Sequence, residues 1–526
     1  MSPDKMTPTE EHLVGVIAKL AKRIEQLEKQ QQQSKGETTR PDVKPSRLNQ
    51  PGSGTAQGKG QGKSKNGKSQ KRPGSAKRSK TEHLEIHETV LLHPDNLPDG
   101  AVLVGYQDFV VQDLIFCSHN VQYRRARYQL PEGGFVTASL PKEVRGHFGA
   151  GLMAHVLYQH HQNGVTQPLI REELLEVGID ISTGQINRLL TEDHDPFHQE
   201  KDELLLAGLA VSRYFHTDDT SARHGGRNGY ANHIGNELFT TFTSSDTKSR
   251  VNFLQVLLGP ARSYILNLDA LFYLEVHGVS EAVRERFQGP AKAWTLFADD
   301  ATWQGWLGQQ SLSGEHRRLL TEATLWAALL QQEVVTEVIV SDDAPQFKIF
   351  GFWNGLCWVH AERGVNRLAP LNQRQLRAQE RVQDQIWTFY QELKSYRQAP
   401  SRRDKTRLER EFDRIFTQST SWGALNDALR TIHAKKEQLL LVLEHPDVPL
   451  HNNLAENDIR DYVKKRKISA GTRSDLGRRC RDTFLSLKKT CRKLGVSFWD
   501  YLKDRVAQLH EIPPLPELIR AAAENN

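Results

Sequence analysis

The chain has 526 residues, of which 37% are hydrophobic and 25% charged, so it is long enough for several domains but too polar to be packed throughout. Its net charge of +6 is uneven, because residues 35–80 carry 13 Lys and Arg against Glu37 and Asp42, a charge of +11, which leaves −5 for the other residues. Four cysteines exclude a disulfide scaffold, and with no apolar leader after Met1 and no run of about 20 apolar residues we expect a soluble, cytoplasmic protein with no membrane partner.

Residues 1–34 have the pattern of a coiled coil. The core positions of its heptads would be filled by Leu13, Ile17, Leu20, Ile24 and Leu27. Isoleucine at position a with leucine at position d favours two parallel strands, so we expect an oligomerisation helix and a homodimer or higher oligomer. The alternative is a single amphipathic helix packed on its own chain.

Residues 35–80 consist mainly of Gly, Ser, Gln, Pro, Lys and Arg, with almost no large apolar side chain. Such a segment buries too little surface to offset its ordering entropy, so we expect a disordered basic linker. Its positive charge would attract the DNA backbone without sequence preference. A solubilising spacer would have the same composition.

Two modules are expected before the catalytic core. Residues 81–146 contain the alternating and aromatic runs 101–106 and 109–111 and indicate a small β-containing module. Residues 147–205 have helical periodicity, and the two helices on either side of the turn 178–181 fit a helix-turn-helix. Its second helix would place Gln185, Asn187 and Arg188 in a DNA groove. An ordinary helical core has similar spacing.

The catalytic core is expected to begin at residue 206. The run Leu209–Thr217 is rich in strand formers and stops at Asp218, and further strand candidates are Tyr230–Thr243 and Arg250–Gly259. Residues 262–333 are mostly helical in pattern and are interpreted as an insertion. The acids Asp299 and Asp300 within it follow no clear strand, so we interpret them as structural rather than catalytic.

A second strand, Val334–Ser341, stops at Asp342. Three antiparallel strands followed by a parallel strand that carries a second Asp is the order of a ribonuclease-H-like sheet. Cys357 and His360 have zinc-compatible spacing but no second pair nearby, so Cys357 is expected to be packed, whereas His360 and Arg363 would face the site and hold a phosphate.

Residues 361–445 are expected to form an α-helical insertion, and residues 446–510 the second part of the core, followed by a C-terminal tail at 511–526. Asn452 and Asn453 are expected to cap a helix whose first turn contains Glu456. Its basic side chains, which would track DNA phosphates, are Arg460, Lys464, Lys465, Arg466 and Lys467. On the next helix, from Ser474, a single apolar face contains Cys480 and Cys491 as packing residues.

Three carboxylates therefore stand out, although a helix-terminal charge would also account for Glu456. Asp218 and Asp342 lie at strand ends, where α/β sheets build their sites, and Glu456 lies in the first turn of a helix. Together they would hold two Mg²⁺ (or Mn²⁺) ions of the kind that cleave phosphodiesters. A zinc site is not expected.

The segments HTDDTSARHGG, VIVSDDAPQF, CWVHAERG and LHNNLAENDIRDYVKKRKISAGTRS resemble the transposases of the bacterial insertion sequence 66 family. The resemblance extends over most of residues 140–505 and is highly specific in the last segment. It implies an Asp-Asp-Glu triad of Asp218, Asp342 and Glu456, and the zipper and helix-turn-helix also look like the family's arrangement. The family's cysteine-rich zinc module has no counterpart in residues 81–146, which contain only Cys117, and the insertion at 262–333 is atypical.

The sequence therefore predicts a multidomain α+β protein with a ribonuclease-H-like mixed α/β catalytic core, a large α-helical insertion, an N-terminal coiled coil and a helical DNA-binding region. We expect a DNA transposase that binds transposon ends and cleaves and joins DNA strands, with DNA and possible accessory transposition proteins as partners. A transposase-derived protein that binds DNA but no longer cleaves it, and a nonspecific nuclease, are the alternatives.

Overall fold

The structure is a computed structural model that describes residues 85–93, 101–104, 106, 109–141, 144, 146–260, 262–332 and 335–525. The predicted coiled coil at 1–34 and linker at 35–80 lie outside the described residues. The described residues fall into two units, one within 19–117 and one within 118–526. The described residues of the first unit contain no helix or strand.

The second unit begins with a short exposed hairpin. Strands β1 (Arg127–Gln129) and β2 (Phe135–Thr137) pair antiparallel across a turn in which Gly133 and Gly134 both adopt positive φ. Every residue of both strands is exposed. This hairpin is the only regular structure among the described residues of the predicted β-containing module.

Among the described residues of this unit, five helical segments precede the central sheet. They are α2 (Ala150–Tyr158), the π-helical turn η3 (Gln159–Asn163), α3 (Gln167–Glu176), α4 (Thr183–Thr191) and α5 (Asp195–Val211). The Ser182 side chain caps α4 by accepting a hydrogen bond from the Gln185 backbone N–H at 3.1 Å, in agreement with the predicted start of this helix. In the part of the chain that the structure describes, every helix is too short or too polar to cross a bilayer.

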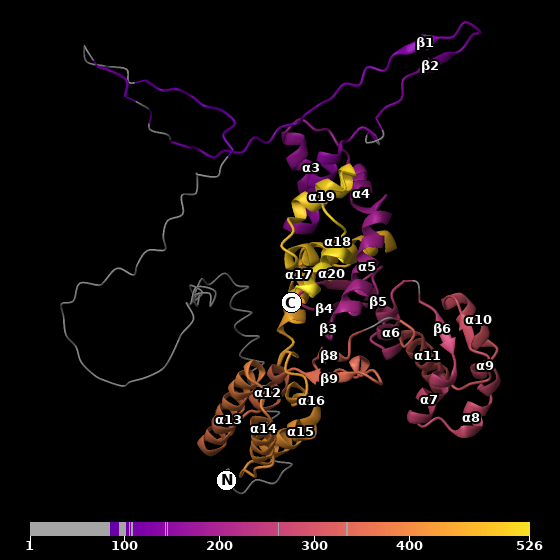
Figure 1. The fold of residues 1–526 in the computed structure, drawn as a ribbon, viewed down its shortest axis with the longest axis vertical. Helices are drawn as coiled ribbons and strands as arrows, with labels where there is room; N and C mark the ends of the chain where they lie inside the picture. Colours follow the sequence, from indigo (N-terminus) through magenta and orange to yellow (C-terminus); the bar gives the residue numbers. More distant parts are fainter. Residues whose placement is uncertain are drawn as a thin grey trace, which may run out of the picture. The chain divides into compact units, whose positions relative to one another are not determined.

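The centre of the unit is a mixed five-stranded sheet in the order β5-β4-β3-β8-β9. Figure 1 shows β4, β3, β8 and β9 following one another in this order. The strands are β3 (Tyr214–Ser221), β4 (Tyr230–Gly235), β5 (Thr240–Ser245), β8 (Val338–Ser341) and β9 (Trp353–Leu356). The first three are antiparallel to one another, whereas β8 is parallel to β3 and β9 is parallel to β8. The sheet thus has the predicted order of three antiparallel strands followed by a parallel one.

All four predicted strands differ from the observed elements in bounds or type, and the one expected at 334–341 begins at Val338. Residues 209–211 end helix α5, and β3 continues past Asp218 because residues 218–221 pair with β4. The single strand expected at 230–243 is the hairpin of β4 and β5. The run Arg250–Gly259 forms helix α6 (Arg250–Leu258) instead of a strand, since a short apolar run fits a buried helix as well as a buried strand.

The first insertion is mostly helical, as predicted, and contains one small antiparallel sheet. Its elements are β6 (Tyr264–Leu266), α7 (Leu268–Val276), α8 (Glu281–Glu285), α9 (Gln288–Lys292), β7 (Thr295–Phe297), α10 (Asp300–Gly308) and α11 (Gly314–Leu329). A short strand, β7, therefore does precede Asp299, contrary to the prediction. Asp299 caps α10 through a capping box, and Asp300 accepts hydrogen bonds from Arg262 and Tyr264, so both acids have structural partners.

The second insertion forms a helical body with its own hydrophobic core. Its elements are α12 (Trp358–Asn366), α13 (Gln373–Gln398), α14 (Arg402–Phe416), α15 (Gly423–His433) and α16 (Lys436–Leu439). The two ends of this body meet, since the Trp358 backbone N–H donates to the Leu450 carbonyl at 3.0 Å. The chain therefore returns to the sheet close to the point at which it left.

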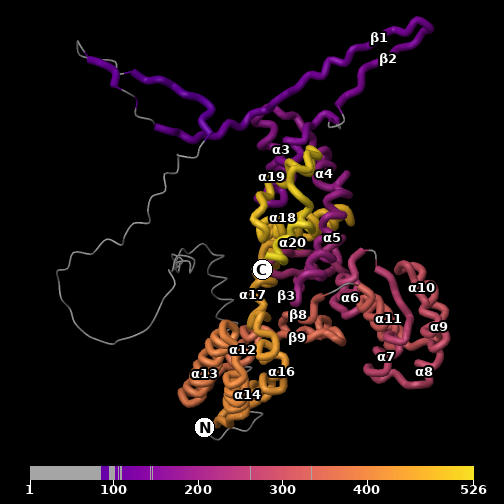
Figure 2. Tube along the Cα trace, viewed as in Figure 1, coloured from indigo at the N-terminus to yellow at the C-terminus, as the bar shows by residue number. Residues whose placement is uncertain are grey.

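Helices α17 (Asn453–Ser469), α18 (Asp475–Lys493), α19 (Phe498–Ala507) and α20 (Leu515–Glu524) complete the unit. Helix α18 packs along β5 and α5, and α20 also packs on α5. In Figure 2 the yellow C-terminal helices lie beside the magenta α5. The buried face of α18 includes Cys480, Phe484, Leu487 and Cys491, so both cysteines are packing residues as predicted.

A buried ionic network joins α17 and α18 to the sheet. The Asp458 carboxylate accepts hydrogen bonds from Thr240 at 2.7 Å and Lys493 at 2.9 Å and lies 3.0 Å from His233 Nε2 and 3.4 Å from Lys489. These contacts hold the pKa of Asp458 well below its usual range, with His233 and the two lysines outweighing burial. Asp458 is only two residues beyond Glu456, so this network fixes the helix that presents Glu456.

We expect Asp458→Ala to lower the free energy of unfolding by about 3–5 kcal/mol, because it leaves the buried Lys493 ammonium group without its counter-charge. Asn457→Ala, at the exposed neighbouring position, is the matched control and should change it by less than about 0.5 kcal/mol. Chemical denaturation of both variants measures the difference. Equal stabilities would contradict the anchoring role of Asp458.

Candidate active site

Asp218 on β3 and Asp342, which directly follows the neighbouring strand β8, lie at corresponding positions. Strands β3 and β8 pair in parallel, with His216 opposite Val340 as the last pair. Asp218 and Asp342 each lie two residues beyond that pair, and adjacent strands are separated by about 4.8 Å. The register therefore brings two carboxylates, 124 positions apart in the sequence, to one edge of the sheet.

The structure also distinguishes the two acids of each Asp-Asp pair. The side chains of Asp218 and Asp219 point to opposite faces of β3, since side chains alternate along a strand. The second acid of each pair has a lysine partner. Asp219 pairs with Lys248, and Asp343 pairs with Lys348 at 2.7 Å and with Lys435 at 2.5 Å. Among the described residues, Asp218 and Asp342 have no such ion pair, so they are the acids left with uncompensated charge.

The environment of Asp218 changes the pKa of its carboxyl group. Burial raises the pKa of Asp218 from its usual 3.8 to about 7, with repulsion from Asp342 as the second cause and smaller contributions from Asp219 and Glu456. A hydrogen bond of 2.7 Å from the Asp219 backbone N–H opposes the shift only in part. Asp218, Asp342 and Glu456 thus form one electrostatic cluster.

Helix α17 is joined to this edge of the sheet by Asn452. The buried Asn452 side chain donates to the Thr217 carbonyl at 2.9 Å, and its oxygen lies 2.9 Å from His216 Nδ1. The Asn452 backbone N–H donates to Cys357 Sγ at 3.2 Å. Asn452 was expected to cap α17 with its side chain, but that side chain bonds to β3 instead, one residue from Asp218. The first turn of α17, with Glu456, is therefore held beside the two aspartates.

Basic side chains surround the Glu456 carboxylate. His360 Nε2 lies 3.8 Å and Arg363 3.6 Å from Oε1, and Arg460 lies 3.9 Å from Oε2. Arg363 also donates to His360 Nε2 at 2.8 Å. Burial and Arg363 lower the pKa of His360, whereas Glu456 and Asp342 oppose that shift, so His360 lies in the field of both acids. The predicted phosphate-holding pair His360 and Arg363 thus faces the candidate site.

The donor set suits a hard divalent cation, because Mg²⁺ prefers carboxylate oxygens. Glu456 Oε1 is buried without a hydrogen-bond partner, and Asp218 and Asp342 repel each other. Within the described ranges, no three His, Cys, Asp or Glu side chains are already arranged around a common ion position. The acids therefore have the chemistry that such an ion prefers, but this structure does not place them around one ion position.

The residues predicted to read DNA bases lie on α4. Asn187 and Arg188 are exposed, and Gln185 is half-buried near the start of the helix. Asn187 accepts a hydrogen bond from Gln167 of α3 at 3.1 Å, so the two helices are joined at this face.

The basic residues of α17 separate into two groups. Arg460, Lys464 and Lys467 are exposed. Lys465 and Arg466 have protein partners, because Lys465 donates to the His160 carbonyl at 2.5 Å and Arg466 to the Ser221 hydroxyl at 2.6 Å. Lys465 and Arg466 are therefore tied to other elements, and phosphate contact by the five residues stays a prediction.

Sequence reasoning missed the roles of His216 and Cys357 in holding α17. The local sequence pattern predicts that His216 lies in a strand and that Cys357 is packed. Both residues are indeed buried, but the pattern does not show that they contact Asn452. Their contacts to Asn452 join residues 236 and 95 positions apart, which no local pattern encodes. The only available signal is the occurrence of Asn452 directly before an acid-bearing helix.

Comparison with known proteins identifies the class to which this arrangement belongs. Residues 322–479, from α11 into α18, match the family described as Transposase IS66 family. An uncharacterized protein, y4jO, from Sinorhizobium fredii is 40% identical over 327 residues, which is 61% of this chain and 100% of that relative. The matched family segment contains Asp342 and Glu456. These similarities place the chain among the transposases.

The chain belongs to the IS66 transposase family. Family membership supports a transposase-type function and implies that the protein binds DNA.

We expect Asp218→Asn to stabilise the protein at pH 8 and to leave its stability unchanged near pH 4. A carboxyl whose pKa is about 7 when folded and near 3.8 when unfolded penalises folding increasingly as pH rises between these values, and asparagine removes the penalty. The difference in Tm between variant and wild type, followed from pH 4 to 8 without divalent ions, tests this. A difference independent of pH would contradict the raised pKa.

Proposed function

We propose that this protein is a metal-dependent DNA transposase in which Asp218, Asp342 and Glu456 form the catalytic triad on a ribonuclease-H-like core. The observation that supports the proposal is the position of the three acids: Asp218 is on β3, Asp342 directly follows the neighbouring parallel strand β8, and Glu456 is on a helix held to β3 by Asn452. The strand order, with three antiparallel strands followed by two parallel ones, supports the assignment of the core.

Two Mg²⁺ or Mn²⁺ ions bound by these acids would polarise the attacking oxygen and stabilise the leaving oxygen of a phosphodiester. The chain's own contribution is to concentrate negative charge. Asp218 would have to lose the proton that its raised pKa retains, and Asp342 would then share the cation's charge. His360 and Arg363 would hold the phosphate next to Glu456, since both already contact a negatively charged group there.

The reaction would have two stages. In strand cleavage, a water oxygen bonds to phosphorus while the bond to the 3′ oxygen breaks, which leaves a 3′-hydroxyl and a 5′-phosphate. In strand transfer, that 3′-hydroxyl oxygen bonds to a phosphorus of target DNA while a second 3′ oxygen leaves. Neither stage requires a covalent bond between protein and DNA.

Helix α4 would read the transposon ends as the second helix of a helix-turn-helix. Its exposed Asn187 and Arg188 support this role, because amide and guanidinium groups pair with base edges in the major groove. Pairing of two ends would require at least a dimer, for which the coiled coil predicted at 1–34 remains a proposal.

A DNA-binding protein that no longer cleaves DNA is the second candidate. The observation that favours it is the set of ion pairs around Glu456, which would have to open or rearrange for that carboxylate to bind a cation.

The experiment combines purified full-length protein, Mg²⁺ or Mn²⁺, and a plasmid carrying the DNA that flanks its gene. Asp218→Asn, Asp342→Asn and Glu456→Gln should each reduce cleavage and joining by at least about 10³-fold while DNA binding is retained. Asp343→Asn is the matched control, because Asp343 is already paired with lysines and its φ of 80° suits asparagine. Its activity should stay close to that of the wild type.

Other outcomes separate the alternatives. Specific binding to the flanking DNA with no cleavage by the wild-type protein would support the second candidate. Cleavage that ignores the end sequence would indicate a nonspecific nuclease.

A further inference from the structure

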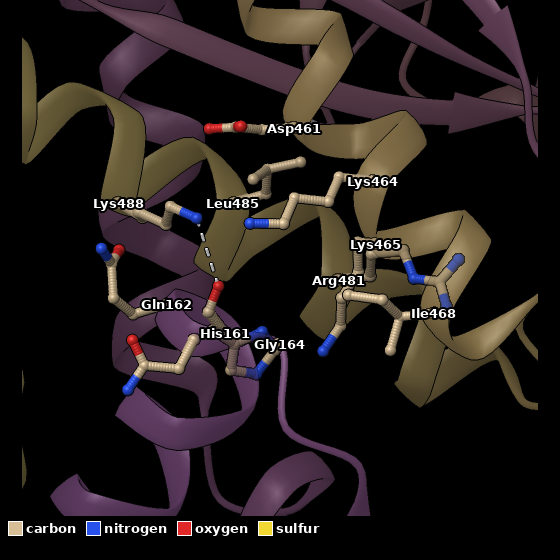
Figure 3. A pocket seen from close by; sticks show the side chains of 11 residues that line it. His161, Gln162, Gly164, Asp461, Lys464, Lys465, Ile468, Arg481, Leu485 and Lys488 are labelled. Atoms are coloured by element: carbon tan, nitrogen blue, oxygen red, sulfur yellow. Dashed lines mark hydrogen bonds between the residues drawn. The ribbon is translucent and has the colours of Figure 1, made fainter. Parts of the chain in front are cut away.

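A small cavity lies between helices α17 and α18 and the π-helical turn η3. Its volume is about 40 Å³, and Figure 3 shows the side chains of Lys464 and Lys488 reaching toward one another across it. We call it the basic pocket, after its cationic lining residues Lys464, Lys465, Arg481 and Lys488. It lies outside the cluster of three acids and is not used in the proposed reaction.

The four cations of the basic pocket outnumber the one acid that lines it, Asp461, whose attraction opposes the effect of burial on the pKa of Lys488 without overcoming it. In the part of the chain that the structure describes, none of its four cations forms an ion pair. The one acid that lines the pocket, Asp461, is paired with Lys489 at 2.6 Å. Burial, followed by repulsion from Arg481 and Lys488, lowers the pKa of Lys465 to about 7. Repulsion among these cations therefore raises the free energy of the folded protein.

Structural roles account for only part of this arrangement. Lys465 donates to the His160 carbonyl at 2.5 Å, and Arg481 donates to the Ser469 hydroxyl at 2.9 Å. Lys488 has only a long hydrogen bond of 3.4 Å to the His161 carbonyl, which a neutral amide would make as well. Lys464 is exposed at the rim of the pocket. The ammonium groups of Lys464 and Lys488 are thus the ones that need a ligand.

We propose that the basic pocket binds one phosphate group of the DNA backbone. A single water needs roughly 10–15 Å³ of such a cavity, so the pocket admits a group of a few heavy atoms and excludes a base. Ammonium and guanidinium groups are the usual partners of phosphate oxygens. This inference rests on the proposed function only in requiring that the protein binds DNA.

The position of the pocket argues for DNA rather than a free anion. Helix α17 carries both Glu456 and Lys464, eight residues apart, which is about 12 Å along the helix axis. At about 3.4 Å per nucleotide along one strand, this distance corresponds to a few nucleotides. The turn η3 leads into α3 and α4, so the bound phosphate would connect the candidate end-reading helices with the helix that presents Glu456.

The test compares Lys488→Gln with Lys292→Gln, an exposed position on α9 in the first insertion, outside the pocket. Binding to a labelled duplex is measured at several salt concentrations without divalent ions, so cleavage plays no part. Lys488→Gln should weaken binding about tenfold and reduce the slope of log affinity against log salt by about 1, whereas Lys292→Gln should have little effect. Equal affinities for the wild type and Lys488→Gln would overturn the proposal.

Thermal unfolding of the free proteins separates a binding role from a structural one. Removing the Lys488 charge relieves repulsion, so the Tm of Lys488→Gln should equal or exceed that of the wild type, opposite in direction to its loss of DNA affinity. A lower Tm with unchanged DNA affinity would assign Lys488 a structural role and overturn the proposal. The same follows if inorganic phosphate raises the Tm through Lys488 while DNA affinity does not depend on this residue.

Failure of the wild-type protein to bind any duplex would overturn the proposed function and the phosphate site together. Normal binding with no cleavage would leave the phosphate site supported and count against the catalytic triad alone.

Discussion

The hydrogen bonds of Asn452 are the contacts on which the candidate site depends. An amide buried without partners costs free energy, so Asn452 is stable in its position only while the Thr217 carbonyl and the His216 ring are in place. Those partners are the two residues that directly precede Asp218 on β3. The same side chain therefore fixes the start of α17 and its distance from the strand that presents the first acid.

A second set of contacts supports the same helix two residues after Glu456. The Asp458 network ties α17 to β4, β5 and α18, and each of its charges is compensated within a buried environment. The acids of the site show the opposite arrangement, because Asp218 and Asp342 face each other without a cation. The charges that hold helix α17 in place are thus paired, whereas the carboxylates that would bind a ligand are not. Unpaired acids with shifted pKa values are typical of functional sites.

The residues that identify the site could be read from the sequence, because each lies at the end of a recognisable local pattern. A β-branched run before Asp342 and an Asn-Asn pair before the helix of Glu456 are local signals, and the capped start of α4 at Ser182 is another. The sequence did not predict which acid of each Asp-Asp pair lacks an ion pair. That depends on Lys248 and Lys435, which come from distant segments of the chain. The apolar run at 250–258 was misassigned because its composition does not distinguish a buried strand from a buried helix.

The single backbone hydrogen bond between Trp358 and Leu450 shows how the second helical insertion is attached. The insertion leaves and rejoins the sheet at neighbouring positions and has its own hydrophobic core. Its attachment therefore adds little strain to the sheet. The outer helices α13–α15 can change in length in evolution as long as α12, which carries His360 and Arg363, and Leu441, which packs with Val338 and Val340 of β8, stay in place. The architecture thereby separates two evolutionary demands, a fixed arrangement around the acids and outer helices that are free to vary.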